Sequence, residues 1–314
     1  MRVMLVHNTR AGDGLPPGEL KRAIEDAGHE IVREIAKGEP LALDDEDRVE
    51  LVAVAGGDGT VGDVARAVAG SGVPLAVLPL GTANNVARSL GVSGEPAELA
   101  RRWSGGAPRV RFDLGAAQGP WGQQRFLEGA GLGLVPAAIT AAQERGKKKI
   151  AESGGGPIEG ARRVFRGALR KLKPTRFAVT ADGERLDGDY LLVQVLNIRS
   201  VGPNLVLSPD ADPADGFLDL VLAGESERDA LRALLEDDGD DRDLAASLPV
   251  RRVRSVEVSR RENTASETRA GRGAGRDSEK FDGGAVHVDD DVRPSDEAST
   301  LSLTVQPGQV EFLV

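Results

Sequence analysis

The chain of 314 residues contains no cysteine, only three histidines, and few aromatic side chains, which make up 3% of the sequence. The absence of cysteine excludes disulfides and thiol catalysis, and it favours a reducing, cytoplasmic location. The histidines His7, His29 and His287 are too dispersed along the chain to indicate a metal site or a catalytic triad. Because aromatics are scarce, we expect a core built mainly from aliphatic side chains.

Long apolar runs are missing as well. No stretch approaches the ~20 residues that a transmembrane helix needs, and the apolar run in MRVMLVHNTRAG is too short for a signal peptide. The net charge of -10 argues against general nucleic-acid binding. We therefore expect a globular protein without a membrane span and without a nucleic-acid partner.

Positive charge is concentrated in one segment. Residues 145–173 contain ten Lys or Arg and two Glu. Helical spacing in IEGARRVFRGALRKLKP places its apolar residues on one face and its cations on the rest. This pattern makes 145–173 a candidate for peripheral contact with an anionic membrane. The alternative is a helix that packs on the protein and exposes a solvated basic face.

The first 111 residues alternate between short apolar runs and helical patterns. The apolar runs lack polar alternation, as expected for strands covered on both faces of a parallel sheet, and they lie at 1–7, 51–55 and 73–81. Helical spacing is found between and after them, for example at 62–69. The pattern predicts an α/β domain with a mostly parallel sheet over residues 1–111.

Residues 112–314 have a different sequence pattern. Segments such as RFAVTADGERLDGDYLLVQVLNI contain strand-like runs joined by Asp-Gly turns, which predicts a second, mainly β domain built as a sandwich. Within it, residues 260–284 are polar and glycine-rich. We interpret them as a mobile loop rather than a folded unit.

The sequence GGDGT, at residues 56–60, joins one of the apolar runs to a helical pattern. Glycines and bare backbone N–H groups at a helix N-terminus favour a bound phosphate. Asp58 would repel a phosphate unless a metal ion lies between them, so the pattern indicates a nucleotide whose phosphates are bridged to Asp58 by Mg²⁺. The alternative is a tight turn in which Asp58 caps the helix.

Two further turns have a similar design. PLGTANNVAR at 79–88 repeats the order of strand, glycine, polar residues and helix, and NTRAGDG at 8–14 follows the first apolar run. In an open α/β sheet such turns meet at the carboxyl ends of the strands, which is where ligands bind. The three turns together therefore favour a nucleotide site over an isolated tight turn.

GGDGT followed by PLGTANNVARSLG resembles the diacylglycerol kinase catalytic family, and specifically its bacterial YegS-like lipid kinases. The first motif is shared with NAD kinases, whereas the second is similar to the lipid-kinase branch. A later segment, LNIRSVGPNLVLSPDADPADGFLDLVL, also resembles this family. The resemblance implies ATP bound between an α/β domain and a β-sandwich. It also implies Mg²⁺-dependent phosphorylation of a lipid hydroxyl, with diacylglycerol or a related lipid alcohol as the acceptor.

The resemblance further implies roles for particular residues. Asp58 would organise Mg²⁺, and Asp113 matches an aspartate near the metal network. Asp212, Asp215 and Phe217 match a separate structural Mg²⁺ site, to which main-chain oxygens contribute. The residues that would cradle ATP are Asn8, Gly56, Gly57, Asp58, Gly59, Thr60, Val61, Gly62, Gly81, Thr82 and Asn84.

A kinase of this type needs a carboxylate that accepts the proton of the lipid hydroxyl. The family carries it in a late Asp-Gly-Glu motif, for which this chain offers two alignments. FDGGA retains Asp282, whereas VHVDDD places Asp289 at the motif's aspartate and Asp291 at its acidic end. The distance to the C-terminal strand favours the second, so Asp291 is the predicted general base. The alternative is a solvated acidic loop.

The chain departs from the family pattern at three places. Asn85 stands where the family often has Asp, Asp290 replaces a glycine, and VGPN replaces a Gly-Gly pair. Two alternatives to a lipid kinase therefore remain. One is a pseudokinase that binds nucleotide or lipid without turnover, and the other is an NAD kinase, against which GTANNVAR argues.

Overall fold

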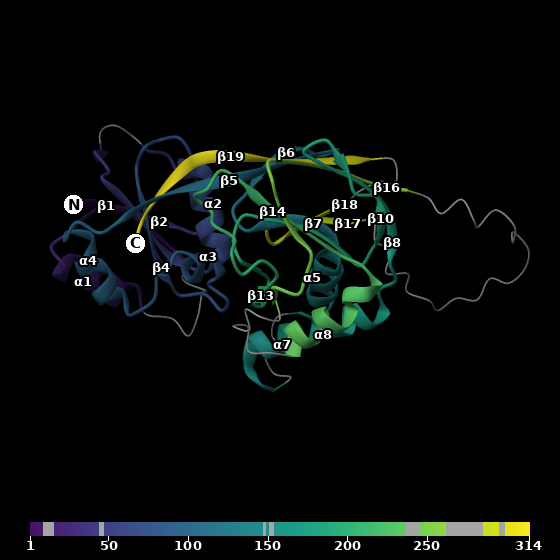
Figure 1. Cartoon of the computed structure of the whole chain (residues 1–314). Coiled ribbons are helices and arrows are strands. Elements are labelled where there is room, and N and C mark those ends of the chain that lie inside the picture. Colours follow the sequence, from purple (N-terminus) through teal and green to yellow (C-terminus); the bar gives the residue numbers. More distant parts are fainter. Residues whose placement is uncertain are drawn as a thin grey trace, which may run out of the picture.

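The computed structural model describes residues 1–8, 16–43, 47–146, 149–150, 154–236, 245–261, 285–294 and 299–314. The predicted loop at 260–284 lies outside these residues from 262 onward. A parallel sheet with helices forms one half of the molecule, and two stacked sheets with helices beneath them form the other (Figure 1).

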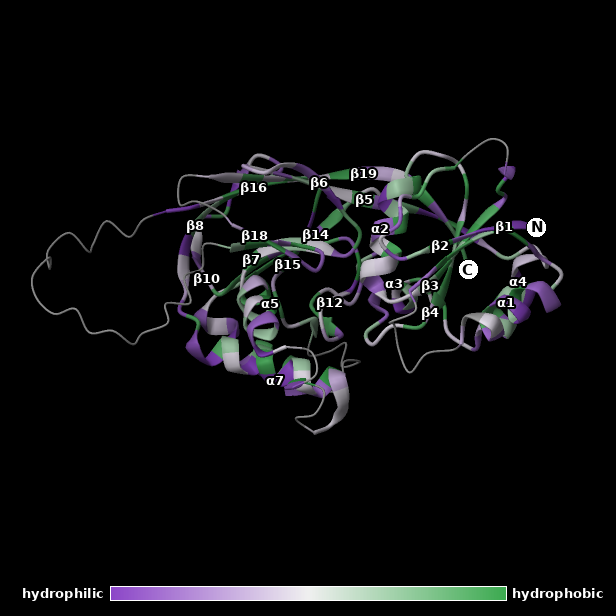
Figure 2. Cartoon of the chain, turned by 180° about the vertical axis from the view of Figure 1, so that it is seen from behind, coloured by the Kyte–Doolittle hydropathy of each residue, from purple (hydrophilic) through white to green (hydrophobic). Residues whose placement is uncertain are grey.

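The first half is built on parallel strands in the order β4-β3-β1-β2. Every residue of β3 is buried, which explains why its sequence lacks polar alternation. Figure 2 shows hydrophobic residues gathered on these strands. The strands are β1 (Arg2–His7), β2 (Glu30–Ala36), β3 (Leu51–Gly56) and β4 (Leu75–Pro79), and the helices are α1 (Pro17–Asp26), α2 (Asp58–Val68), α3 (Asn85–Ser89) and α4 (Pro96–Trp103).

The last strand, β19 (Thr300–Leu313), connects the two halves. Its end runs parallel to β4, with Phe312 opposite Leu75, while most of its length pairs antiparallel with β5 (Arg109–Gly119). A register shift between Gln306 and Val310 interrupts the pairing with β5, and beyond it Phe312 and Leu313 lie between β5 and β4. The parallel sheet therefore continues into the sandwich through one strand, and the predicted domain division at 111/112, which falls inside β5, stays a prediction.

The second half stacks two sheets. The first sheet continues from β19 through β16 and β8 to β10, and β5 adds β6 while β8 adds β9. The second has the order β15-β14-β11-β7-β17-β18, and β12 and β13 form a separate hairpin. The bounds are β6 (Gly122–Phe126), β7 (Gly129–Gly133), β8 (Thr175–Ala181), β9 (Glu184–Arg185), β10 (Gly188–Tyr190), β11 (Leu192–Leu196), β12 (Ser200–Val201), β13 (Leu205–Val206), β14 (Leu218–Ala223), β15 (Val250–Val253), β16 (Ser255–Arg260), β17 (Ala285–Val288) and β18 (Asp291–Pro294).

Aliphatic residues fill the space between the two sheets, among them Val179, Val195 and Val258. The helices α5 (Leu134–Arg145), α7 (Gly156–Lys171) and α8 (Arg228–Glu236), with a short 3₁₀ turn η2 (Glu225–Glu227), cover the second sheet (Figure 1). The prediction of an α/β half and a β-sandwich half is confirmed. Within the described ranges, no helix is long and apolar enough to span a membrane.

Candidate active site

Two glycine-rich turns meet at the carboxyl edge of the parallel sheet, one after β3 and one after β4. The Leu80 N–H donates to the Gly56 carbonyl at 3.1 Å. A Cβ at Gly81 would lie 2.3 Å from the Cα of Gly57, and one at Gly57 would lie 3.0 Å from the Cα of Gly81. Both positions therefore require glycine because the two backbones touch, and this contact joins the turns into one surface.

Asn84 and Asp58 hold these turns in shape. Asn84 has a left-handed backbone, with φ of +52°, and its side chain accepts from the Gly81 N–H and donates to the Gly81 carbonyl, both at 2.9 Å. Asp58 Oδ1 accepts from the Val86 N–H at 3.0 Å, near the start of α3. Asp58 thus caps the neighbouring helix rather than its own, while it remains at the edge where the turns meet.

The other residues predicted to bind the nucleotide differ in exposure. Asn8, the residue after β1, donates from Nδ2 to Thr60 Oγ1 at 3.4 Å, and Thr82 is exposed. Val61 and Gly62 are buried within α2. The Val61 side chain packs in the core, so the less buried start of this motif, Gly57 to Gly59, is the part open to a ligand.

Four carboxylates come together beside these turns, and we refer to Asp58, Glu128, Asp289 and Asp290 as the acidic group. A Cβ at Gly59 would lie 3.2 Å from Asp290 Oδ2, so the Asp290 carboxylate adjoins the GGDGT turn. Burial raises the pKa of Asp58, and the negative charge of Asp290 raises it further, although backbone N–H groups oppose both effects. The group thus combines carboxylates from both halves of the chain.

Glu128 is a member that the sequence analysis missed. It lies between β6 and β7, and it is 5% exposed. Burial raises its pKa well above the usual value, and the charges of Asp58, Asp290 and Asp289 act in the same direction. The surrounding letters, RFLEGAG, contain no motif that would mark this glutamate.

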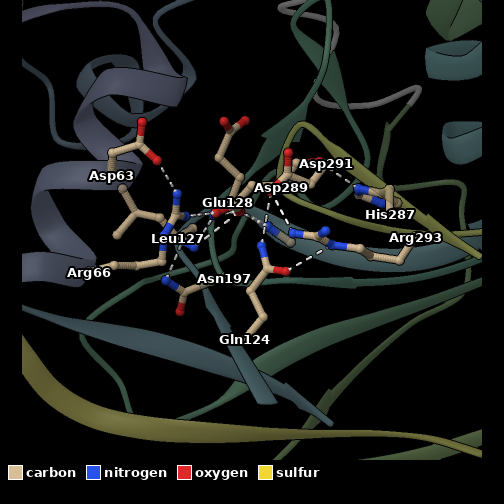
Figure 3. Close-up of polar contacts among 11 residues, drawn as sticks. Asp63, Arg66, Gln124, Leu127, Glu128, Asn197, His287, Asp289, Asp291 and Arg293 are labelled. Carbon is tan, nitrogen blue, oxygen red and sulfur yellow. Dashed lines mark hydrogen bonds and ion pairs between the residues drawn. The ribbon is translucent and has the colours of Figure 1, made fainter. Parts of the chain in front are cut away.

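Asp289 anchors the hairpin formed by β17 and β18 (Figure 3). Its Oδ1 accepts from the N–H groups of Glu128 at 2.8 Å and Leu127 at 3.1 Å, and Gly129 adds a bond at 3.3 Å. Its Oδ2 pairs with Arg66 of α2 at 2.7 Å. Both oxygens are therefore engaged in holding the hairpin turn against α2 and the β6–β7 connection.

Asp291, the predicted general base, does not join the acidic group. Its side chain is 58% exposed, and Oδ2 accepts from Arg293 at 3.2 Å and from Gln124 at 3.3 Å. It is the first residue of β18, whereas Asp289 and Asp290 form the two-residue turn before it. The other candidate, Asp282, lies outside the described residues.

Asp113 belongs to a different part of the molecule from Asp58. Its Oδ2 accepts from the Gly216 N–H and its Oδ1 from the Gly308 N–H, both at 2.7 Å. Its own N–H donates to the Pro213 carbonyl at 2.7 Å. Asp113 thus ties the 212–217 loop to the register shift in β19, and the structure does not bring it into the acidic group as the resemblance implied.

The predicted structural Mg²⁺ site at Asp212, Asp215 and Phe217 forms a turn closed by its own hydrogen bonds. Asp215 Oδ1 accepts from the Phe217 N–H at 2.9 Å, and Asp212 accepts from the Ala214 N–H at 3.0 Å. Asp215 also forms an ion pair with Arg252. Over the described ranges, no group of three or more His, Asp or Glu side chains is arranged to hold a metal.

In the basic helix α7, some arginines form hydrogen bonds with the rest of the protein and are not free to face solvent. Arg162 is 4% exposed and donates to the carbonyls of Pro203 at 3.1 Å and Asn204 at 3.2 Å. Arg166 donates to the Leu235 carbonyl at 2.7 Å. Hydrophilic and hydrophobic residues alternate along this helix (Figure 2). Its middle therefore packs on the protein, as the alternative interpretation expects.

Two family models match the chain. The diacylglycerol kinase catalytic domain matches residues 2–116, and the YegS C-terminal NAD kinase beta sandwich-like domain matches residues 163–280. The acidic group draws Asp58 from the first matched region and Glu128, Asp289 and Asp290 from outside both regions.

Two named bacterial proteins are similar to the chain in sequence. A Pseudomonas putida protein named "Probable lipid kinase YegS-like" is 36% identical over 194 residues, which are 60% of this chain and 61% of that protein. A Mycobacterium tuberculosis protein named "Diacylglycerol kinase" is 28% identical over 213 residues, or 67% of this chain and 63% of that protein. The alignments thus span somewhat less than two thirds of these relatives.

Solved structures share the fold. The crystal structure of a diacylglycerol kinase from Bacillus anthracis superposes with a TM-score of 0.63 and 20% identity, over 99% of this chain and 96% of that one. An NAD kinase from Archaeoglobus fulgidus in complex with ATP superposes with a TM-score of 0.52 and 14% identity, over 100% and 94% of the two chains. At these identities the likeness concerns the fold alone.

Proposed function

We propose that the protein is a lipid kinase, because its two halves match the diacylglycerol kinase catalytic domain and the YegS C-terminal NAD kinase beta sandwich-like domain. It would transfer the γ-phosphoryl group of ATP to the hydroxyl group of diacylglycerol or a related lipid alcohol. The observation that carries this proposal is the meeting of two glycine-rich turns with carboxylates from both halves of the chain. Such an edge of an α/β sheet suits nucleotide phosphates.

The acidic group fits Mg²⁺ held together with nucleotide phosphates. Carboxylate oxygens are the ligands that Mg²⁺ prefers, and Asp58 is the member that lies within the GGDGT turn itself. The described side chains do not form a closed cage of three His, Asp or Glu, which suits an ion that takes most of its ligands from phosphates and water. When bound, Mg²⁺ neutralises charge that develops on the transferred phosphoryl group.

For the proton of the lipid hydroxyl, we propose Asp290 rather than Asp291 as the acceptor. The hydroxyl oxygen bonds to the γ-phosphorus, the bond to the β–γ bridging oxygen breaks, and ADP leaves. Asp290 lies at the phosphate-binding turn, whereas Asp291 is exposed and bonded to Arg293 and Gln124. Asp289 is less suited because its oxygens already anchor the hairpin.

The proposal is tested by transfer of labelled γ-phosphate from ATP to a panel of lipid alcohols in anionic mixed micelles. We expect a labelled phospholipid that forms only with Mg²⁺ present. Labelled NADP from an NAD control would instead favour an NAD kinase. ATP binding without any labelled product would favour the pseudokinase and contradict the proposed activity.

We also propose that the exposed end of α7 contacts an anionic membrane, through Arg170, Lys171 and the following Lys173. Reversing all three to Glu should weaken binding to anionic vesicles by more than about tenfold, because each cation near such a surface contributes about 1 kcal/mol. The matched control reverses three exposed arginines of the first half, Arg22, Arg101 and Arg102. Equal weakening by the two variants in a vesicle co-sedimentation assay would show that only net charge matters.

A further inference from the structure

Helix α2 carries both the GGDGT turn and Arg66. The helix begins at Asp58, and Arg66 follows about two helical turns later. The Arg66 guanidinium group has two partners, because Nη1 donates to Asp289 Oδ2 and Nη2 donates to Asp63 Oδ1, both at 2.7 Å (Figure 3). Asp63 belongs to the same helix, so it holds the guanidinium in place while the other arm reaches the β17–β18 hairpin.

Gly62, which the sequence analysis assigned to the nucleotide cradle, leaves room for this guanidinium. A Cβ at Gly62 would lie 3.1 Å from Arg66 Nη1, the nitrogen that pairs with Asp289. Such a contact is tighter than ordinary van der Waals packing, so a side chain at this position would press the guanidinium away from the hairpin. Glycine within a helix is less stable than alanine, and the space that Arg66 needs is a reason for it here.

The β17–β18 turn is held firmly on its own side. Asp289 has a left-handed backbone, with φ of +50°. Its N–H donates to the Gly129 carbonyl at 2.8 Å, and its carbonyl accepts from His287 Nδ1 at 2.9 Å. Its carboxylate accepts from the Glu128 N–H at 2.8 Å. Because the backbone and the side chain of Asp289 are both engaged, these bonds set the position of the next residue, Asp290.

The helix and the turn meet at two points. At the first, Asp290 Oδ2 lies 3.2 Å from where a Cβ at Gly59 would be. At the second, Arg66 meets Asp289, and their side chains are 23% and 11% exposed. One contact would let the hairpin pivot on the helix, whereas two contacts fix its orientation. The second contact thus sets where the carboxylate at the first contact lies.

We infer that Arg66 is a positioning residue, which holds the Asp290 carboxylate beside the GGDGT turn by way of Asp289. A carboxylate that accepts the proton of a hydroxyl group has to stay within hydrogen-bond reach of it. Misplacement by about 1 Å can lower a rate by roughly 100-fold. The inference rests on the proposed function for the role of Asp290 as the proton acceptor. Where the carboxylate lies is a separate question, which is tested without turnover.

Disulfide trapping in the full chain tests the position directly, because the chain has no cysteine of its own. Gly59→Cys/Asp290→Cys places two thiols at the first contact, and the rate at which oxidised glutathione converts them to a disulfide reports how often they meet. Adding Arg66→Met should slow this trapping by about tenfold or more, as loss of a coupled ion pair does.

The matched control is Arg33→Met, which removes another half-buried arginine that ties two segments together. Arg33 of β2 pairs with Asp47 at 3.3 Å, and their side chains are 36% and 30% exposed. This variant should leave both trapping and kcat within about threefold of the parent protein. Thermal unfolding checks that each variant is folded at the assay temperature.

Turnover gives a second readout. Arg66→Met should lower kcat for the lipid alcohol by about 10- to 100-fold and leave KM for ATP within about threefold, because it moves the carboxylate and not the nucleotide. Arg66→Lys should recover part of the loss, since an ammonium group still pairs with Asp289. Arg66→Met/Asp290→Asn should be no slower than Asp290→Asn alone, because Arg66 acts through that carboxylate.

Two outcomes would overturn the inference. One is trapping that is as fast in a folded Arg66→Met protein as in its parent. The other is a double variant in which the losses of Arg66→Met and Asp290→Asn multiply, which is the result of a merely structural role. Failure of the proposed function looks different, because the wild type would then phosphorylate no lipid alcohol. In that case the trapping rates would still decide whether Arg66 positions residue 290.

Discussion

At the scale of single residues, the candidate site depends on two glycines, which have no side chain, as well as on polar side chains. Gly57 and Gly81 leave room for two backbones to touch, and the Asn84 side chain closes the second turn. The glycines were predicted to open the backbone to phosphate. The contact between the turns adds a structural reason for them, which no single motif could reveal because it joins residues 24 positions apart.

Gly81→Ala should therefore destabilise the protein. The added methyl group would lie 2.3 Å from the Cα of Gly57, which is backbone and cannot rotate away. We expect a loss of about 1–3 kcal/mol in the free energy of unfolding, measured by urea denaturation. The control is Gly167→Ala in α7, where nothing lies within 4 Å of the new Cβ, and it should stabilise by about 0.5–1 kcal/mol. Similar effects of the two substitutions would refute the clash.

His287 should make stability depend on pH. Its ring is fully buried between the Asp289 carbonyl and the Gln194 side-chain amide, and burial lowers its pKa from 6.5 to about 4. Because the unfolded chain takes up the proton first, the contribution of His287 is fully present above pH 6.5 and is lost between pH 6.5 and 4.

The wild type should therefore lose roughly 2 kcal/mol more than His287→Gln when the pH falls from 7 to about 5. The comparison uses urea denaturation of both proteins at both pH values, so that the carboxylates they share cancel. Parallel pH dependence in the two proteins would show that the ring takes up its proton at the same pH in the folded and unfolded states, and would contradict the lowered pKa.

At the scale of elements, the turn between β17 and β18 decides which carboxylate lies beside the GGDGT turn. The sequence analysis favoured VHVDDD over FDGGA for the late acidic motif and predicted Asp291 as the general base, and both stay predictions. Pairing of Val288 with Asp291 puts Asp289 and Asp290 in the turn and starts β18 at Asp291. A shift of one residue in a hairpin redirects a side chain, and the register comes from tertiary packing.

Asp290→Asn should lower kcat by at least about 100-fold with little change in the affinity for ATP, because proton acceptors contribute 10²–10⁴-fold. Asp291→Asn is the neighbouring control, since its exposed carboxylate touches only Arg293 and Gln124 among the contacts found. It should change kcat by less than about threefold. A large loss in Asp291→Asn with an active Asp290→Asn would restore the first assignment.

Helix α5 shows that the hydrophobic periodicity of a sequence does not always distinguish a helix from a strand. The run GAGLGLVPAAITAAQ passes from β7 into α5 without a polar break, and β7 is buried at every position. An apolar run of this kind does not distinguish a buried strand from a buried helix. The strands of the first half were easier to predict, because glycine and polar turns bound each of them.

At the scale of the whole molecule, both halves meet at the acidic group and at β19. Family motifs pointed to Asp58 and the glycine turns, because each motif is a run of a few consecutive residues. Glu128 and Asp289 could not be located in this way, because the contact between them spans 161 residues and depends on how the halves pack. The sequence therefore indicated the glycine-turn side of the candidate site better than the side formed by Glu128 and Asp289.

Arg66 and Asp289 should couple the two halves energetically. Arg66 belongs to the helix after GGDGT, Asp289 belongs to the β17–β18 turn, and their side chains are only 23% and 11% exposed. We expect Arg66→Met and Asp289→Asn each to destabilise the protein, and the double variant to lose less than the sum, with a coupling of about 1–3 kcal/mol in urea denaturation. The pair Arg251–Glu184, which is 50% and 60% exposed, should couple by less than about 1 kcal/mol. Additive losses at Arg66 and Asp289 would mean that this ion pair does not hold the halves together.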